Sequence, residues 1–455
     1  MRRSTRRQGT YGQRLSRRRF LTLIAAGAGV GLPALRAQGA SSGWSLAEAA
    51  RPYRGTTIKA ISVTHAANNA TQSYIAEFEK ETGIKVEFEY LERTALNAKL
   101  DVELGARTGA YDLVDNDISK VVRYQKAGWV EPLDKFIQDR NLLDPKAPIA
   151  DFIQPFLKTV TVDGKIYALP FSGESTALFY RTDIYEKHGV KPPKTMEELD
   201  AVNRKIHTPD VPAFAMRAVK GEGMNVYTWT TWLRAYGGKF FDEKGGPLLD
   251  SPGAVKATEE YARLLQTYGP KGVASYRHFE ILADFQQEKL ASWIDATSLA
   301  ARINDPGTSK VTERWAMAPV PRGPAGQFPG IYAHAHSIAA DSKKKEATWL
   351  FIQWYTSPEI QLRRATKEGG AGDITRVSVF ESPEFKKWWS KGNYAEITLE
   401  AAKIALPDFR PTFIPDWLEV GDRLGTAIQQ VITKERDAKS ALAAANADIA
   451  KILRK

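Results

Sequence analysis

The 455-residue chain contains no cysteine. Disulfide bonds, cysteine nucleophiles, iron–sulfur clusters and thiolate-bound zinc are therefore excluded. The sequence also lacks the His-Glu-x-x-His and Gly-x-Ser-x-Gly motifs of common hydrolases, and no glycine-rich phosphate loop follows a predicted strand. We therefore expect no cofactor, no metal site and no lipid anchor attached through cysteine.

Acidic residues and lysine are absent from residues 1–37, which hold nine arginines. Subtracting these nine charges from the net charge of +11 leaves +2 for the rest of the chain. The basic balance thus comes from one short segment and does not indicate a nucleic-acid partner. With 43% hydrophobic and 26% charged residues, the composition predicts a buried core rather than disorder.

The basic N-terminal segment has the pattern of an export signal. Arg17 and Arg18 lie in the run Ser-Arg-Arg-Arg-Phe-Leu, close to the twin-arginine pattern. The apolar stretch at 21–35 is diluted by glycine and is too short to span a bilayer stably. We expect residues 1–40 to be a twin-arginine signal peptide, cleaved after Ala37 or Ala40. The mature protein should then be a soluble periplasmic monomer without a lipid anchor.

Hydrophobic periodicity predicts alternating strands and helices in the first third of the chain. The expected elements are strands at 58–63, 84–90 and 113–114 and helices at 73–81, 96–104 and 118–128. Such a series forms parallel strands with right-handed crossovers, and ligands of open sheets bind beyond the carboxyl ends of the strands. The loops expected at that edge are 64–69, 90–94 and 115–119.

The segment 164–185 has a different character. Asp163-Gly164 predicts a tight turn. Two β-favouring runs, 165–169 and 176–180, flank a stretch of proline, glycine and small polar residues that we expect to interrupt the strand. We interpret this segment as an extended crossing between two packed bodies.

This segment resembles the first hinge of the extracellular solute-binding proteins of bacterial ABC importers, the family that includes maltose-binding protein. Three other segments agree with the family in order: Phe-Glu-Lys-Glu-Thr-Gly-Ile-Lys-Val at 78–86, Tyr-Asp-Leu-Val at 111–114 and Gln-Glu-Lys-Leu-Ala at 287–291. The resemblance covers residues 54–455. It implies a two-lobed α/β periplasmic-binding-protein fold with three hinge crossings and a ligand cleft between the lobes.

The resemblance also implies how the chain divides. Residues 41–170 and 322–358 would form the first lobe, and residues 171–321 and 359–455 the second. Ligand would be captured in the cleft, and closure about the crossings would bury it. A membrane permease, the expected partner, would then bind the closed form.

A sugar or polyol is the ligand that the residue types favour. Hydroxyl groups are bound by carboxylates, amides and guanidinium groups, and C–H faces by aromatic rings. The chain has 11 Trp and 17 Tyr, several of them at predicted cleft edges. The candidate ligand-binding residues are His65, Asn68, Glu92, Asp115, Asp117, Glu174, Trp229, Trp232, Trp293, Asp295, Tyr332, His334 and Arg376.

Some candidates have a plainer interpretation. Trp229 and Trp232 lie three residues apart on one predicted helix, a spacing typical of a core stripe. Glu92 could instead form a surface ion pair with its neighbour Arg93. His334 and His336 lie on one predicted strand, and we expect only one of them to face the cleft.

Two other functions are open at this point. The same fold could bind a polyamine or an anion, because a mixed set of polar residues does not decide the charge of the ligand. An exported carbohydrate-active enzyme could use Asp115 and Asp117 as paired carboxylates. The family resemblance favours binding without chemistry, so we predict that the protein is not an enzyme.

Overall fold

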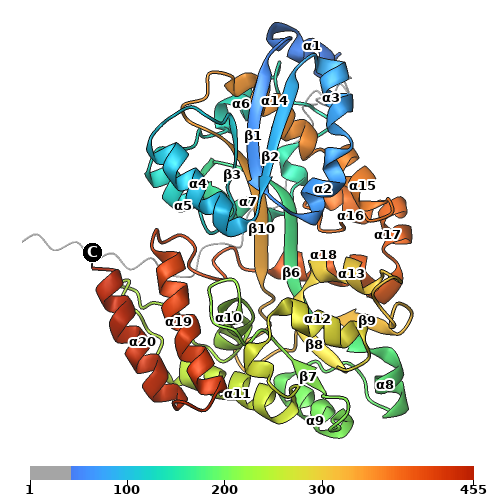
Figure 1. Ribbon diagram of the computed structural model, residues 1–455, viewed down its shortest axis with the longest axis vertical. Helices are drawn as coiled ribbons and strands as arrows, with labels where there is room; N and C mark the ends of the chain where they lie inside the picture. The colour runs from blue at the N-terminus through green and yellow to red at the C-terminus, as the bar shows by residue number, and fades with distance from the viewer. Residues whose placement is uncertain (1–42, 455) are drawn as a thin grey trace, which may run out of the picture. The chain divides into compact units, whose positions relative to one another are not determined.

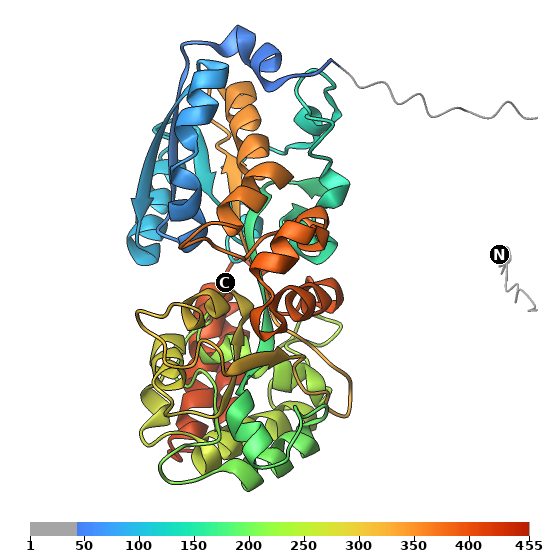
Figure 2. The ribbon, with the colours of Figure 1, turned by 90° about the vertical axis from the view of Figure 1, so that its right-hand side faces the viewer.

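One long strand, β6 (Leu169–Arg181), runs through the centre of the structure and belongs to both halves of its sheet (Figure 1). The computed structural model describes residues 43–454, so the predicted signal peptide lies outside the described residues. The first half of β6 pairs with β10 (Ile331–Ile338), and the second half pairs with β8 and β9. Two lobes therefore meet at the middle of β6, as Figure 2 shows from the side.

The first-lobe sheet has the strand order β2-β1-β3-β10-β6. Strand β1 (Thr57–Val63) lies parallel to β2 (Lys85–Leu91) and β3 (Leu113–Asp115), which confirms the predicted parallel series. Strand β10 runs antiparallel between β3 and β6. The segments that follow the three parallel strands therefore lie at one edge of the sheet, toward the second lobe.

The second-lobe sheet is built on the other half of β6. Strands β8 (Ser292–Ala296) and β9 (Trp315–Ala318) pair with it antiparallel, and β7 (Phe214–Ala215) lies parallel to β8. A separate hairpin of β4 (Thr161–Val162) and β5 (Lys165–Ile166) precedes β6. Its turn residues have φ angles of 49° and 76°, which confirms the tight turn predicted at 163–164.

Strand β6 continues through the stretch that we expected to interrupt it. Pro170 lies opposite Ala335, and a bulge adjoins this pair, so the ladder accommodates the missing amide. Gly173 is needed for close packing, because a Cβ atom there would lie 2.6 Å from the ring of Phe156. The prediction of two separate strands is therefore wrong, since pairing on both sides outweighs local preference.

The predicted loop 64–69 is also partly wrong. Helix α2 (Ala66–Gln72) begins inside it, and His65 is its N-cap, with Nδ1 accepting the amide of Ala67 at 3.2 Å. The side chains of Asn68 and Thr71 are buried in this short helix. A polar sequence thus forms a helix because its caps and buried partners are supplied by the surrounding lobe.

Three hydrophobic cores hold the helices. The first packs the helices of the first lobe on its sheet: α1 (Leu46–Ala50), α2, α3 (Ile75–Thr82), α4 (Arg93–Gly105), α5 (Val121–Lys126), α6 (Asp134–Gln138), α7 (Gln154–Thr159) and α14 (Lys345–Tyr355). The second packs those of the second lobe: α8 (Thr182–Lys187), α9 (Met196–Ile206), α10 (Asn225–Ala235), α11 (Pro252–Tyr268), α19 (Trp417–Ile432) and α20 (Ala438–Ile452).

The third core lies where the lobes meet. It joins Ile118 and Phe156 of the first lobe to Phe179 and Trp293 of the second. Its helices are α12 (His278–Gln286), α13 (Ala300–Ile303), α15 (Pro358–Ala365), α16 (Val377–Glu381), α17 (Pro383–Trp388) and α18 (Tyr394–Ile404). Helix α15 contacts α2, whereas α18 contacts β6 and β9, so the chain passes from one lobe to the other within this core.

None of the helices within residues 43–454 has the length and apolar character needed to cross a bilayer.

Candidate functional site

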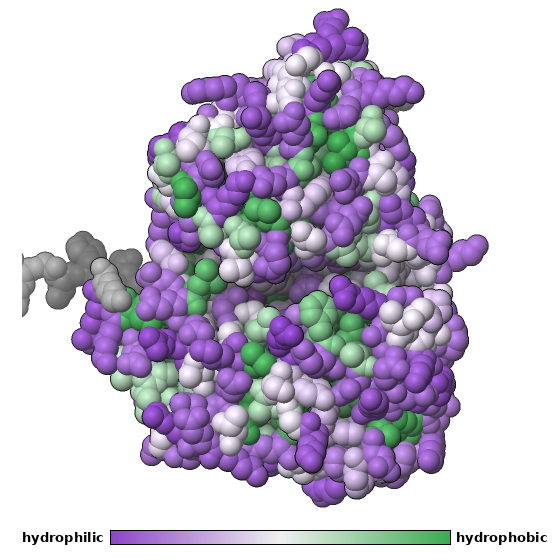
Figure 3. All heavy atoms as spheres, viewed as in Figure 1, coloured by the Kyte–Doolittle hydropathy of each residue, from purple (hydrophilic) through white to green (hydrophobic). Residues whose placement is uncertain are grey.

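The surface is hollowed across the face shown in Figure 3, between the upper and lower lobes. The segments after β1 and β3, the start of β10 and the middle of β6 reach this level from above (Figure 1). Charged and aromatic side chains from both lobes gather here, and most of them are buried. We take this cleft as the candidate site.

The first-lobe wall contains two carboxylates that share one lysine. Asp115 ends β3 and Asp117 follows it, and Lys120 Nζ lies 2.7 Å from Asp115 Oδ1 and 3.4 Å from Asp117 Oδ2. Asp115 also accepts a hydrogen bond from Ser62 at 2.9 Å. Burial alone would lower the pKa of Lys120, but the two carboxylates offset this effect and raise it. Lys120 is therefore charged at neutral pH.

Arg93, the first residue of α4, links this cluster to the start of β10. Its Nη1 donates to Asp117 Oδ2 at 2.6 Å and to the hydroxyl of Tyr332 at 3.3 Å. Its Nη2 lies 3.4 Å from Nδ1 of His334. Burial would raise the pKa of Asp117, but Lys120 and Arg93 together hold it below its usual range.

Three histidine rings line the same wall. The centroids of His65 and His334 are 4.5 Å apart, and those of His336 and Phe171 are 4.2 Å apart. Burial lowers the pKa of His334 well below 6.5 and that of His336 to about 3, so both are neutral at pH 7. Both rings contact Phe171. Residues two apart in a strand point the same way, and His336 packs deeper than His334, against Phe88 and Tyr355, so the expectation that only one of them faces the cleft stays a prediction.

The second-lobe wall is built around an arginine–aspartate pair. Arg217, just after β7, donates through Nε to both oxygens of Asp295 at 2.9 and 3.0 Å, and through Nη2 to Oδ1. Glu174 in β6 accepts the hydroxyl of Ser298. Burial, together with the nearby charges of Asp295 and Asp373, raises the pKa of Glu174, although Ser298 and Arg217 act in the opposite sense.

A series of guanidinium groups and tyrosine rings connects the two walls. The ring of Tyr332 has Arg93 at 5.8 Å on the first-lobe side and Arg410 at 5.5 Å. The ring of Tyr227 has Arg410 and Arg217, each at 4.9 Å. We call this series the arginine–tyrosine ladder. Each of its guanidinium groups also forms an ion pair with a carboxylate, and these ion pairs fix the positions of the three arginines.

Several buried polar atoms at this level have no hydrogen-bond partner among residues 43–454. They are the hydroxyl of Tyr227 and Nε and Nη2 of Arg410. Nη1 of Arg364 and Oδ1 of Asp373 also lack a hydrogen bond, but they form an ion pair with each other at 3.9 Å. Buried polar atoms are nearly always paired, so unpaired donors and acceptors gathered in a cleft mark positions for a polar ligand. Donors and acceptors occur together, as hydroxyl groups require.

The predicted tryptophans lie elsewhere. Trp229 and Trp232 are fully buried in the second-lobe core, and Nε1 of Trp229 donates to Thr258 at 3.0 Å. Trp293 is buried against Phe179, with the ring centroids 4.6 Å apart. The plainer interpretation, a core stripe, therefore describes the surroundings of Trp229 and Trp232.

Other predicted residues are held by the protein itself. Asn68 donates to the carbonyl of Val63 at 2.7 Å and accepts from Tyr355 at 2.7 Å. Arg376 is buried over the ring of Phe152 and donates to two backbone carbonyls. Glu92 is exposed and caps α4, while its neighbour Arg93 turns inward. The remaining predicted residues lie in the two walls: His65, Asp115, Asp117, Glu174, Asp295, Tyr332 and His334.

Sequence reasoning missed the arginines of the site. Arg93 was considered only as a surface partner of Glu92, although its position at the start of a helix after a parallel strand is typical of ligand-contacting segments. Asp373 lies in the glycine-rich loop before Arg376. Nothing in the local sequence of Arg217 or Arg410 distinguishes them from surface arginines.

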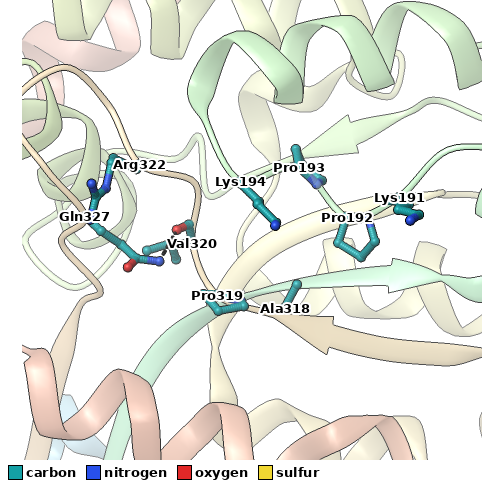
Figure 4. Close-up of a pocket in the computed structure, with 9 residues that line it drawn as sticks. All are labelled: Lys191, Pro192, Pro193, Lys194, Ala318, Pro319, Val320, Arg322 and Gln327. Atoms are coloured by element: carbon teal, nitrogen blue, oxygen red, sulfur yellow. Dashed lines mark hydrogen bonds between the residues drawn. The ribbon is translucent and has the colours of Figure 1, made fainter.

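A separate cavity of about 470 Å³ lies on the second lobe, between the segment before α9 and the segment after β9 (Figure 4). Prolines and Val320 form its walls, with Lys191, Lys194 and Arg322 at the rim, and no carboxylate lines it. Hydroxyl groups need acceptors as well as donors, and Gln327 is the one lining residue whose side chain can accept, so this cavity suits a hydroxyl-rich ligand poorly. None of the predicted site residues lines it.

Within residues 43–454, no group of three or more histidine, aspartate or glutamate side chains is arranged to hold a metal ion.

Comparison with known proteins identifies the family. Residues 63–362 match the model of the bacterial extracellular solute-binding proteins, and the chain belongs to this family. The resemblance inferred from the hinge segment is therefore confirmed. The members of this family similar to the chain are binding proteins rather than enzymes.

Two relatives with assigned ligands cover most of the chain. The mannitol-binding protein of Pseudomonas aeruginosa is 27% identical over an alignment of 396 positions, which covers 83% of this chain and 88% of the relative. The erythritol/L-threitol-binding protein of Mycolicibacterium smegmatis is 24% identical over 397 residues, 81% and 83% of the two chains.

Solved structures confirm the two-lobed α/β fold. An ABC transporter solute-binding protein from Agrobacterium vitis, with bound D-mannitol, is 28% identical, with a TM-score of 0.75 over 88% of this chain and 98% of that one. The one from Agrobacterium radiobacter, in complex with ribitol, is 26% identical, with a TM-score of 0.77 over 88% and 99%.

Proposed function

We propose that this protein is the solute-binding component of an ABC importer and that its ligand is an open-chain polyol. It captures the polyol between the lobes and delivers it to a membrane permease. The observation that carries the proposal is the likeness, over 88% of the chain, to solute-binding proteins solved with D-mannitol and with ribitol.

The chemistry of the cleft supports a hydroxyl-rich ligand. Each hydroxyl group donates one hydrogen bond and accepts others. The walls offer the carboxylate of Glu174 as an acceptor, the free edge of Arg410 as a donor and the hydroxyl of Tyr227 as either. Positive and negative groups are interleaved rather than separated, so the site is matched to a neutral ligand better than to a polyamine or an anion.

The placement of the tryptophans supports an open chain over a sugar ring. Sugar rings are commonly bound by stacking a C–H face on a flat aromatic ring. Trp229, Trp232 and Trp293 are all fully buried in cores, so these rings offer no such platform. An alditol, which presents a hydroxyl on every carbon, needs no such flat platform and is bound mainly through its hydroxyl groups.

Closure of the two lobes explains capture without chemistry. Ligand bound to one wall makes its remaining hydrogen bonds only when the other wall approaches, so it favours the closed form. No step of this cycle breaks a bond of the ligand. The protein acts as a monomer outside the cytoplasm, reached through the twin-arginine signal at residues 1–40, and has no lipid anchor.

A ligand screen tests the proposal. Isothermal titration and thermal shift would compare D-mannitol, ribitol and erythritol with D-mannose, maltose, spermidine and phosphate. A ligand that binds only the folded state raises the melting temperature, by an amount set by its concentration relative to Kd. We expect a saturable shift with one or more alditols, and chromatography should recover the alditol unchanged.

Other results of the screen would contradict the proposal in distinct ways. Binding of spermidine or phosphate alone would keep the fold and replace the ligand. Binding of maltose alone would restore a sugar ring as the ligand. Conversion of the ligand during incubation would support the exported enzyme.

A further inference from the structure

Arg410 is a fully buried arginine contributed by the segment between α18 and α19. Its Nη1 donates to the backbone carbonyl of Glu222 at 2.9 Å and to the carboxylate of the same residue. Trp417 donates to that carboxylate at 2.7 Å. Arg410 also lies beyond the segment matched by the family model, residues 63–362. Its role therefore does not follow from membership in the family.

Two aromatic rings lie next to the Arg410 guanidinium. Tyr227 lies at 4.9 Å and Tyr332 at 5.5 Å, as the central part of the arginine–tyrosine ladder. With Nη1 bound to Glu222, the edge formed by Nε and Nη2 is left. Neither nitrogen has a partner among the described residues.

The Arg410 guanidinium lies where the two lobes meet. Tyr332 belongs to β10, and its hydroxyl accepts from Arg93 of the first lobe at 3.3 Å. Tyr227 belongs to α10 of the second lobe. A guanidinium edge holds two parallel N–H groups at the spacing of two adjacent oxygen atoms. A polar group of the ligand that binds this edge would lie between the first-lobe wall and the second-lobe wall.

We propose that Arg410 binds the ligand through its Nε–Nη2 edge, by donating hydrogen bonds to two adjacent hydroxyl oxygens of the polyol. This inference rests on the proposed function and names the residue that recognises a vicinal diol. A carboxylate fits the same fork, but Glu222 already neutralises Arg410. A second carboxylate would be repelled by the first, whereas a neutral diol is not.

The main test replaces Arg410 with lysine. Arg410→Lys keeps the positive charge and the pairing with Glu222, but an ammonium group lacks the planar fork. We expect the affinity for D-mannitol, measured by isothermal titration, to fall by about tenfold or more, the value of one lost bidentate contact. The melting temperature without ligand should change much less than in a cavity-forming variant.

Arg376→Lys is a matched control. Arg376 is also fully buried, lies over the ring of Phe152 at 3.7 Å and has an unpaired Nη2. Its other nitrogens donate to the carbonyls of Thr356 and Pro148 rather than facing the ladder. We expect this variant to melt at a lower temperature and to bind D-mannitol with unchanged affinity.

A crystal structure of the unmodified chain with D-mannitol gives a test that requires no variant. The inference predicts two neighbouring hydroxyl oxygens within about 3.2 Å of Nε and Nη2 of Arg410. It is overturned if the polyol lies elsewhere in the cleft, or if Arg410→Lys binds D-mannitol as tightly as the unmodified chain.

The ligand series separates this inference from the proposed function. Tighter binding of D-mannonate than of D-mannitol would overturn the diol and assign the fork to a carboxylate. Failure of the unmodified chain to bind any alditol would overturn the function and the diol together. Binding of an alditol with no loss in Arg410→Lys would overturn only the role of Arg410.

Discussion

The two walls of the cleft use buried charge in different ways. In the first lobe, Asp115, Asp117 and Lys120 bind one another and their own lobe, and their contacts are those of a scaffold. In the second lobe, Tyr227 and Arg410 are equally buried but keep polar atoms without partners. Burial alone therefore does not identify a ligand contact. The informative combination is burial together with an unpaired donor or acceptor that faces the cleft.

The largest expected effect comes from removing the lysine of the first wall. Lys120→Met leaves Asp115 and Asp117 buried with one cation fewer. Breaking a buried charge cluster in this way costs about 3–5 kcal/mol of unfolding free energy. Urea denaturation at pH 7 measures it. Lys344→Met is the control, because Lys344 also pairs with a buried carboxylate, Asp112, but is 37% exposed and should cost far less.

If Lys120→Met unfolded at the urea concentration of the unmodified chain, the first wall would not be a scaffold. The distinction between the walls would then be lost.

The next largest effect is on the pH dependence of the unfolding free energy, and it comes from a histidine of the first wall. The pKa of His336 is lowered to about 3 in the folded state, from 6.5. As the pH falls below 6.5, His336 is protonated in the unfolded chain but not in the folded one. Protonation therefore favours unfolding, and the free energy of unfolding, which is unaffected by this group above pH 6.5, decreases as the pH falls. Between pH 6.5 and 5, His336 should account for a loss of about 1.5 kcal/mol.

His336→Gln removes that group, and urea denaturation at several pH values would show a flatter pH dependence. His334, whose pKa is also lowered, remains in the variant and keeps part of the slope. Parallel pH profiles for the variant and the unmodified chain would refute the buried neutral His336.

The second wall should respond in affinity rather than in stability. Tyr227→Phe removes only a buried hydroxyl that has no partner among the described residues. If this hydroxyl bonds the ligand, its loss weakens binding by about 1 kcal/mol, or roughly fivefold, in isothermal titration with the alditol that binds. Stability without ligand should change little.

Tyr185→Phe is the matched control, because the hydroxyl of Tyr185 is also buried without a hydrogen-bond partner but lies in the second-lobe core. Equal effects of the two variants on affinity would show that a hydroxyl without a partner does not mark a contact in this protein.

The smallest effect is expected at a residue outside both walls. Glu92 is exposed and accepts the amide of Thr94 as the N-cap of α4. Glu92→Gln should lower the unfolding free energy by about 0.5 kcal/mol, the low end for a changed cap, in urea denaturation. It should leave the alditol affinity unchanged. A clear loss of affinity would show that Glu92 contacts the ligand, as the sequence analysis predicts.

Much of the fold could be predicted from the sequence because its signals are local. Alternation at 84–90 and the leucines at positions 96, 100 and 104 depend only on which face of an element is buried. The family was recognisable because the hinge segment combines such signals in a fixed order. The continuous strand β6 was not predictable, because Pro170 and Gly173 are tolerated only through pairing and packing with segments far away in sequence.

Some residues of the candidate site could likewise be predicted from the sequence, and others could not. The order of strands and loops in the sequence is enough to place carboxylates such as Asp115 and Asp117 at the ligand-binding edge of a parallel sheet. Which aromatic and basic groups reach the cleft depends on how the elements pack in three dimensions. This packing buried Trp229 and Trp232 in a core and brought Arg93, Arg217 and Arg410 together from distant segments. The physical reason is that periodicity reports the buried face of an element, whereas pairing of charges depends on contacts between elements.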